Sequence, residues 1–331
     1  MLSRTSRLLI VANVCSLWLA LIGSFAAHGE TTAPPNPTLT SATTVTTATE
    51  NANTSPQTTA QTQDGPSAAD LEVCRDLVAR TSRPEAFERL KPFCERARRL
   101  EGCISQEGRP IFHAEHIAPE TKSPTRGKRI LTLGLIHGDE PLSGEMTLSW
   151  VERLRGIPHR SSWRVVPMLN PDGLIRKTRM NARGVDLNRN FPTRDWNDEA
   201  IKYWETSSKR DPRRNPGESP ASEVETRCAI AHIKSFKPDI IISNHTPYAV
   251  IDFDGPRMNF PRYRDLPWRA LGNFPGSLGR YMWKDHQVPV VTVELGHVLP
   301  DTEALQDLLG TFSIEAANRA GAKRPDLFDL L

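Results

Sequence analysis

Hydrophobic residues beyond position 128 occur as short, nearly unbroken runs that alternate with segments of helical periodicity. Apolar runs of this kind are typical of strands buried on both faces of a sheet. The predicted strands are 129–136, 163–169, 239–243 and 289–295. The predicted helices are 141–154, 222–236 and 301–320. The alternation predicts an α/β fold, a three-layer sandwich with a mixed, mainly parallel central sheet flanked by helices.

The start of the second of these helices has a recognisable signal. Ser222 and Glu225 have the spacing of a capping box, so Ser222 is expected to cap the helix. Residues 69–105 have apolar positions three and four apart, which predicts helices there as well. We therefore divide the folded part of the chain into a short helical, cysteine-containing segment at 69–108 and a main domain at 109–331.

The first 68 residues have the pattern of processing and linker segments. Positive residues precede an apolar stretch and then small residues, which predicts a signal peptide at 1–29. An uncleaved membrane anchor is the alternative, because the apolar stretch approaches spanning length. Residues 30–68 are rich in Thr, Pro, Ala, Asn and Gln, which predicts a disordered linker. It serves either as a tether or as a spacer without a specific role.

Charge and cysteine content narrow the class of protein. The net charge of +3 on 331 residues gives no indication of a nucleic-acid partner. Four cysteines remain after removal of 1–29, and in an exported chain they are expected to form disulfides. Of the three connectivities, we prefer Cys74–Cys94 with Cys103–Cys228. The cysteines are not expected to bind metal, because no Cys-x-x-Cys spacing occurs.

Polar residues follow four of the predicted strands at the point where each strand ends. His137 follows the first strand, residues 170–173 (Asn-Pro-Asp-Gly) follow the second, His245 follows the third, and Glu294 lies near the end of the fourth. Sites in open α/β sheets gather at the carboxyl ends of the strands. We therefore expect these side chains to meet at one edge of the sheet.

A catalytic zinc ion uses three protein ligands and keeps one position for water. His137, Glu140 and His245 provide two imidazoles and a carboxylate, and we predict that they bind one Zn²⁺. Asp139 is expected to orient a ligand histidine or a nearby arginine. His232 lies within a predicted helix and is expected to be structural.

The remaining polar residues suit hydrolysis of an amide bond. Glu294 interrupts an apolar strand and is predicted to be the general base. Arg176 is predicted to stabilise the oxyanion, with Arg179 as the alternative and a further substrate-binding residue. Asn188 and Arg189 are predicted to bind a substrate carboxylate, which would make the enzyme an exopeptidase.

In this order the motifs resemble the signature of the zinc carboxypeptidases of the carboxypeptidase A type (M14), over roughly residues 109–321. Within that family the chain is most similar to the murein peptide amidases, which cleave the γ-D-glutamyl–meso-diaminopimelate bond. The segments that carry this likeness are 137–141, 181–192, 222–227 and 275–279. The resemblance implies zinc ligation by His137, Glu140 and His245, with Glu294 as general base.

The chain also departs from its relatives. Digestive carboxypeptidases carry a mobile tyrosine before the Gly-Ser segment, and residues 271–275 contain none. The exported, cysteine-containing leader favours the periplasm or cell envelope over a cytoplasmic role. Diaminopimelate has a second amine and carboxylate, for which Asp252, Asp254 and Arg280 are the candidates.

The sequence therefore predicts an exported zinc metallocarboxypeptidase that acts on peptidoglycan stem peptides (muropeptides) through zinc-activated water. No nucleic acid and no membrane partner beyond an uncleaved N-terminal anchor is expected. An N-acyl amino acid deacylase of the same fold is the first alternative. The second alternative is a catalytically inactive module that binds the cell wall.

Overall fold

The computed structural model describes residues 66–119, 127–158 and 160–321. The predicted signal peptide, and the predicted linker apart from its last three residues, lie outside this part of the chain. The described residues contain one six-stranded sheet with the order β1-β3-β2-β4-β6-β5. Its strands are β1 (Ala114–His116), β2 (Arg129–Leu133), β3 (Ser162–Val166), β4 (Ile240–His245), β5 (Val250–Asp254) and β6 (Val290–Glu294).

The four predicted strands form the parallel centre of this sheet. β3, β2, β4 and β6 run parallel to one another, whereas β1 and β5 pair antiparallel with them at the two edges. The prediction of a mixed, mainly parallel sheet is confirmed, although the two short edge strands were not predicted.

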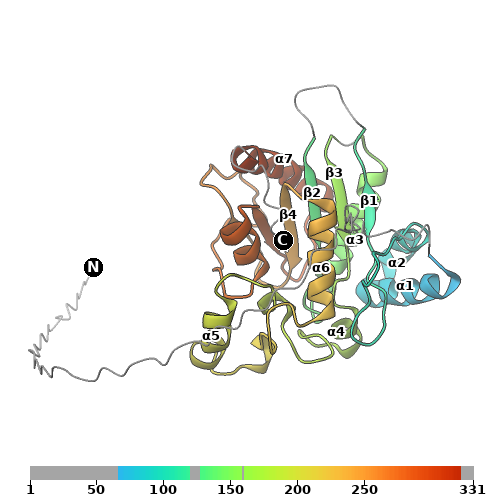
Figure 1. Cartoon of the computed structure of the whole chain (residues 1–331). Coiled ribbons are helices and arrows are strands. Elements are labelled where there is room, and N and C mark those ends of the chain that lie inside the picture. The colour runs from blue at the N-terminus through green and yellow to red at the C-terminus, as the bar shows by residue number, and fades with distance from the viewer. Residues whose placement is uncertain (1–65, 120–126, 159, 322–331) are drawn as a thin grey trace, which may run out of the picture. The chain divides into compact units, whose positions relative to one another are not determined.

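Helices cover both faces of the sheet, as Figure 1 shows for α6 (Val224–Phe236) and α3 (Pro141–Arg155). Successive side chains of a strand point to opposite faces, so two separate cores form. Ile130 belongs to the core under α3 and α7 (Thr302–Gly321), whereas its neighbour Leu131 belongs to the core under α6. The three-layer sandwich expected from the sequence is therefore present.

The helical segment before the main domain is shorter than predicted. It contains α1 (Ala68–Thr81), α2 (Pro84–Leu90) and a 3₁₀ helix at Lys91–Glu95. The prediction of helix for 96–105 is wrong, because Arg98 and Ile104 make β-bridges with His113 and Pro110. These backbone pairings replace the hydrogen bonds that a helix would need.

Both preferred disulfides, Cys74–Cys94 and Cys103–Cys228, are present.

The predicted cap of α6 needs correction, because Glu223 rather than Ser222 precedes its first turn and caps it without a side-chain hydrogen bond. The Ser222 hydroxyl instead donates to the Glu223 carboxylate at 2.7 Å. The remaining elements are α4 (Pro171–Arg176), α5 (Ile201–Thr206), 3₁₀ helices Leu187–Arg189 and Pro212–Arg214, and π-helical turns Trp196–Ala200 and Arg280–Asp285.

The N-terminal segment is joined to the main domain by buried polar contacts as well as by apolar packing. The Asp172 carboxylate is fully buried and accepts hydrogen bonds from the Ser105 hydroxyl, the Glu107 amide and Arg109, at 2.6 to 2.8 Å. The buried Glu145 carboxylate pairs with Arg83 at 2.9 Å. Removing either cation would leave a buried carboxylate without its charge partner, which is costly.

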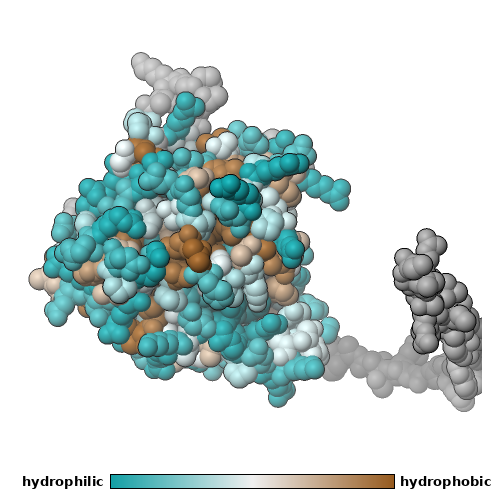
Figure 2. Space-filling model, turned by 180° about the vertical axis from the view of Figure 1, so that it is seen from behind, coloured by the Kyte–Doolittle hydropathy of each residue, from teal (hydrophilic) through white to brown (hydrophobic). Residues whose placement is uncertain are grey.

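The hydropathy of the surface and of the helices can be set against what a membrane-spanning protein requires. Figure 2 shows one face on which hydrophilic side chains predominate and hydrophobic ones form small patches. Among the described residues, no helix combines the length and hydrophobicity needed to cross a bilayer.

Candidate active site

Three predicted metal ligands meet at the carboxyl ends of β2 and β4. His137 lies in the turn that follows β2, Glu140 directly precedes α3, and His245 is the last residue of β4. The turn is tightly packed, since a Cβ on Gly138 would lie 2.0 Å from the backbone of Gly173. This close approach explains why a glycine follows the histidine.

The donor atoms of these three residues face one another. The Nδ1 atom of His137 lies 2.8 Å from Glu140 Oε1 and 3.2 Å from Nδ1 of His245, which lies 3.2 Å from Glu140 Oε2. Zinc bonds of ~2.0–2.1 Å in a tetrahedral arrangement separate neighbouring ligands by roughly 3.3 Å. The donor set and its spacing therefore fit one Zn²⁺.

The other nitrogen of each histidine is held by a neighbouring side chain. Nε2 of His137 lies 3.1 Å from Asp186 Oδ1, and Nε2 of His245 lies 3.0 Å from the Ser243 hydroxyl. The Asp186 carboxylate accepts a hydrogen bond from the N–H group at Nε2. The lone pair of His137 is then on Nδ1, where it can bind a metal. The sequence alone did not indicate this role for Asp186.

We expect Asp186→Asn to weaken zinc binding by about 10- to 100-fold, because the charged acceptor that fixes the His137 tautomer is lost. Competition with a zinc chelator would measure the dissociation constant. Asp139→Asn is the matched control. Its carboxylate pairs with Arg213 at 2.7 Å and makes no contact with a histidine, so zinc affinity should stay within about threefold. Equal weakening in both variants would contradict the assignment to Asp186.

Glu294 ends β6 beside this cluster, in register with His245. Its side chain is 8% exposed, and its Oε2 atom is buried without a hydrogen-bond partner. Burial raises the pKa of the Glu294 carboxyl above its usual value. A carboxylate held in this way has one oxygen free to accept a proton from a molecule in the cavity.

The structure brings only one of the two candidate arginines to the site. Arg179 lines the cavity, with Nε 3.1 Å from Asp186 Oδ2 and Nη1 3.5 Å from Glu140 Oε1. Arg176 is half exposed, pairs with Glu107 and does not line the cavity. The expectation for Arg176 therefore needs correction, because α4 ends at Arg176 and Lys177 takes a left-handed conformation that turns the chain.

Asn188 and Arg189, the residues expected to bind a substrate carboxylate, also line the cavity. The Asn188 side-chain oxygen accepts the Leu278 amide at 2.9 Å, which leaves its NH₂ group as the donor for a ligand. The buried Arg189 guanidinium lies 4.5 Å from the centre of the Phe274 ring, and its Nε has no hydrogen-bond partner. An orphaned donor of this kind suits an anionic ligand.

One cavity of about 800 Å³ is bordered by His137, Glu140, Arg179, Asn188, Arg189, His245 and Glu294. Its lining also contains two further carboxylates, Asp252 and Asp254 on β5. Arg280, the third residue considered for diaminopimelate, is not part of this lining. It donates to Asp195 and, at 3.2 Å, to the Asn273 carbonyl, so its guanidinium is already engaged.

Asn170, the first residue of the Asn-Pro-Asp-Gly motif, makes hydrogen bonds to two of the chain segments that form the site. Asn170 accepts the Gly173 amide at 2.9 Å and donates to the carbonyls of Ile136 and Arg179 at 3.2 and 3.3 Å. The Asn170 side chain thus connects Ile136, which precedes His137, with Arg179, whose guanidinium lines the cavity. His297, which follows Glu294 by three residues, also lines the cavity.

Comparison with known proteins agrees with this site. The profile of the zinc carboxypeptidase family, peptidase M14, matches residues 94–267. Murein peptide amidase A of Escherichia coli K12 is 31% identical over 232 residues, covering 66% of this chain and 91% of the relative. Murein peptide amidase A of Vibrio campbellii is 32% identical over 206 residues, covering 59% and 77%.

Solved structures show the same fold. Thrombin-activatable fibrinolysis inhibitor has a TM-score of 0.53 at 18% identity, covering 76% of this chain and 81% of its own. The bovine protein in complex with tick carboxypeptidase inhibitor has a TM-score of 0.51 at 16% identity, covering 79% and 99%.

The fold and the site define a metallopeptidase. The chain belongs to the zinc carboxypeptidase family, peptidase M14, and its cofactor is zinc.

Proposed function

We propose that this protein hydrolyses the amide bond between γ-D-glutamate and meso-diaminopimelate in peptidoglycan stem peptides. One observation carries the proposal: the buried His137, Glu140 and His245 cluster shares its cavity with the unpartnered Oε2 of Glu294 and the unpartnered Nε of Arg189. The relatives named murein peptide amidase support a peptide of peptidoglycan as the substrate. A function in the cell envelope, after export, fits that substrate and the two disulfides.

Each side chain then has one role. His137, Glu140 and His245 would hold the zinc ion, which would supply Lewis acidity and lower the pKa of a water towards ~7. Glu294 accepts a proton from the attacking water and returns it to the leaving amine. Arg179 donates to the oxygen on which negative charge develops.

The substrate carboxylate is bound at the other end of the cavity. Asn188 and Arg189 donate to it, so the bond that is cleaved lies next to a free carboxylate. This requirement makes the reaction that of a carboxypeptidase.

We expect Arg179→Ala to lower kcat by about 10²- to 10³-fold, because the donor to the developing oxyanion is lost. Arg176→Ala is the matched control, since this arginine lies three residues earlier and pairs with Glu107 outside the cavity. Its kcat should change by less than about threefold. Steady-state kinetics on one muropeptide measures both, and the reverse order of effects would return the role to Arg176.

In this proposal, the side chain of the leaving amino acid faces acidic residues that line the cavity. Asp252 and Asp254 line the cavity, and no ion pair with either is present among the described residues. Burial, together with the neighbouring Asp252 carboxylate, raises the pKa of Asp254 to about 6. Two carboxylates that make no ion pair among the described residues suit the second ammonium group of diaminopimelate.

We expect Asp254→Asn to reduce the preference for an ammonium-bearing substrate by about 10- to 100-fold, as expected for a lost charged hydrogen bond. The measurement is the ratio of kcat/KM for γ-D-Glu–diaminopimelate to that for the analogue lacking the second amine. In the unmodified protein this ratio should fall as pH drops through about 6, because the Asp254 carboxyl becomes protonated. The ratio for the variant should not depend on pH over that range.

Mass spectrometry of purified muropeptides incubated with the protein tests the proposed function itself. We expect loss of a terminal diaminopimelate in zinc-replete protein and no loss after chelation. N-acyl amino acids serve as the comparison substrates. Turnover of these compounds without release of diaminopimelate would identify a deacylase and refute the proposal.

A further inference from the structure

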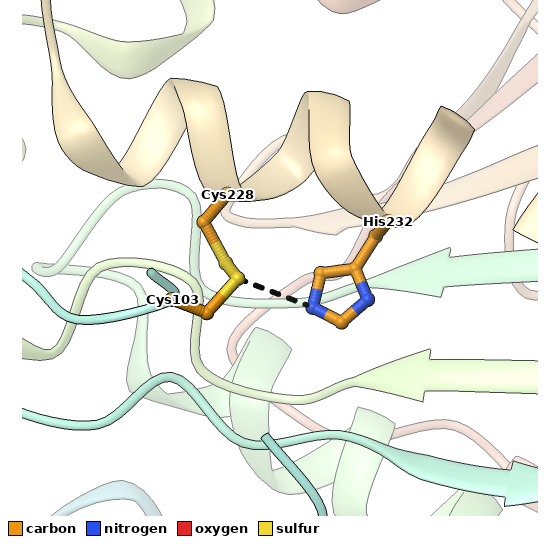
Figure 3. Close-up of side chains that lie close together, drawn as sticks. All are labelled: Cys103, Cys228 and His232. Carbon is orange, nitrogen blue, oxygen red and sulfur yellow. Dashed lines mark hydrogen bonds between the residues drawn. A yellow bond between two sulfur atoms is a disulfide. The ribbon is translucent and has the colours of Figure 1, made fainter. Parts of the chain in front are cut away.

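A second group of metal-ligating side chains lies under α6, and none of its members lines the active-site cavity. It consists of Cys103, Cys228 and His232, which Figure 3 shows pointing towards one another. All three are buried. In the structure the two cysteines form a disulfide.

The geometry of this group is that of a small metal site. Cys228 and His232 are four residues apart on α6, so their side chains lie on the same face of the helix. Sγ of Cys103 lies 3.9 Å from Nε2 of His232, and the donor atoms of the three residues lie within 4.8 Å of one another. Zinc bonds of ~2.0–2.3 Å place ligand atoms roughly 3.5 Å apart, so small side-chain shifts would suffice.

Two imidazoles in this region lack ordinary partners. Nδ1 of the fully buried His232 has no hydrogen bond, and neither Nδ1 nor Nε2 of the fully buried His113 has one. The two rings pack edge to face with their centres 4.9 Å apart. Buried polar atoms usually have partners, so the unpartnered nitrogens of His232 and of the His113 ring packed against it suggest a ligand.

The charge state of these histidines also suits metal binding. Burial lowers the pKa of His113 to about 4 and that of His232 well below its usual value, and Arg164 adds to both shifts. Both rings are therefore neutral, the form in which imidazole binds a metal. The charge of Arg164 is itself balanced by Glu115 at 2.7 Å.

We propose that Cys103, Cys228 and His232 form a zinc-binding site when the disulfide between the two cysteines is reduced, with His113 as the adjacent fourth donor. A dithiol supplies two electrons and two protons, the S–S bond breaks, and two thiols form. Zinc binding then releases both thiol protons to solvent and leaves two thiolates as ligands.

Disulfide and metal exclude each other, because the same two sulfur atoms serve in both. Either one joins the loop that carries Cys103 to α6, so the N-terminal segment stays attached to the main domain in both redox states. The pairing of Cys103 with Cys228 could be predicted from the sequence, but a metal site could not, because its ligands have no Cys-x-x-Cys spacing and His232 was expected to be structural.

Cobalt binding to the full chain tests the proposal. The protein carries Cys15→Ser, Cys74→Ser and Cys94→Ser, so that Cys103 and Cys228 are the only cysteines of the full chain. The active site offers only nitrogen and oxygen donors, and a thiolate-to-cobalt absorption band therefore reports the new site alone. We expect one Co²⁺ per chain and no such band in the oxidised protein, and two Co²⁺ with the band after reduction by a dithiol that is then removed.

His232→Gln is the matched variant. It retains both thiols and should weaken the second cobalt ion by at least about tenfold, as loss of a ligand requires. A single cobalt ion per reduced chain would overturn the proposal. A band of equal strength and affinity in His232→Gln would also overturn it, because the thiols would then bind cobalt without the histidine.

Thermal unfolding gives a second, independent measurement. With the active site saturated, further Zn²⁺ should raise the melting temperature of the reduced protein but not that of reduced His232→Gln. If the reduced chain unfolds without metal, Zn²⁺ should restore its helical circular dichroism. An equal response of the two proteins would contradict the proposal.

Discussion

Replacing Glu294 by glutamine is expected to lower kcat by about 10³-fold, within the 10²- to 10⁴-fold range of general acid–base catalysis. Glutamine preserves the size of the side chain and removes its ability to accept a proton. The carboxylate is buried at the end of β6, and its Oε2 has no hydrogen-bond partner among the described residues that could take over this role. Single-turnover hydrolysis of a muropeptide separates this chemical step from substrate binding.

Two controls make the result specific to proton transfer. Zinc content should remain one ion per chain, since Glu294 is not part of the cluster that fits the metal. KM should change little, because Asn188 and Arg189 rather than Glu294 bind the substrate carboxylate. Unchanged turnover in Glu294→Gln would require another base, and loss of zinc would show a structural defect instead.

Removal of the metal is expected to abolish hydrolysis, with a loss of more than about 10³-fold, because both the Lewis acid and the activation of water disappear. One equivalent of Zn²⁺ should restore activity. Mg²⁺ should not, since two imidazole nitrogens and one carboxylate suit zinc far better than magnesium. The measurement is kcat/KM after dialysis against a chelator, followed by titration with each ion.

The same experiment has a readout that does not depend on activity. Zinc at about 1,000 times its dissociation constant stabilises the folded state by ~4 kcal/mol. The apoprotein should therefore melt at a lower temperature, and His245→Ala should show the lower value with or without zinc. Full activity in metal-free protein would exclude the zinc-dependent mechanism.

The central strands could be predicted from the sequence because burial on both faces requires an uninterrupted apolar run. Residues 239–243 have that signal, and they lie in β4 in the middle of the sheet. The edge strands lack it. β1 has three residues and β5 carries Asp252 and Asp254, so neither has the composition of a buried strand. Their pairing is determined by neighbours that are distant in sequence.

The metal cluster could be predicted for a related reason. His137 and His245 follow strands that are adjacent and parallel, so their ends must meet. The choice between two arginines could not be made in the same way. Arg176 and Arg179 differ by three residues, and the left-handed Lys177 between them decides which guanidinium enters the cavity. A local turn of this kind leaves little trace in the pattern of hydrophobic residues.

The buried Asp172 has a consequence for protein engineering. Its three partners come from residues 105–109, so the division drawn from the sequence at residue 109 cuts through a network of buried hydrogen bonds. A truncated enzyme that starts there would retain every residue of the active site and Arg109, but it would lose two of the three hydrogen-bond donors to this buried carboxylate. The N-terminal helices are thus part of the minimal unit for recombinant expression, which should begin no later than Ser67, the cap of α1.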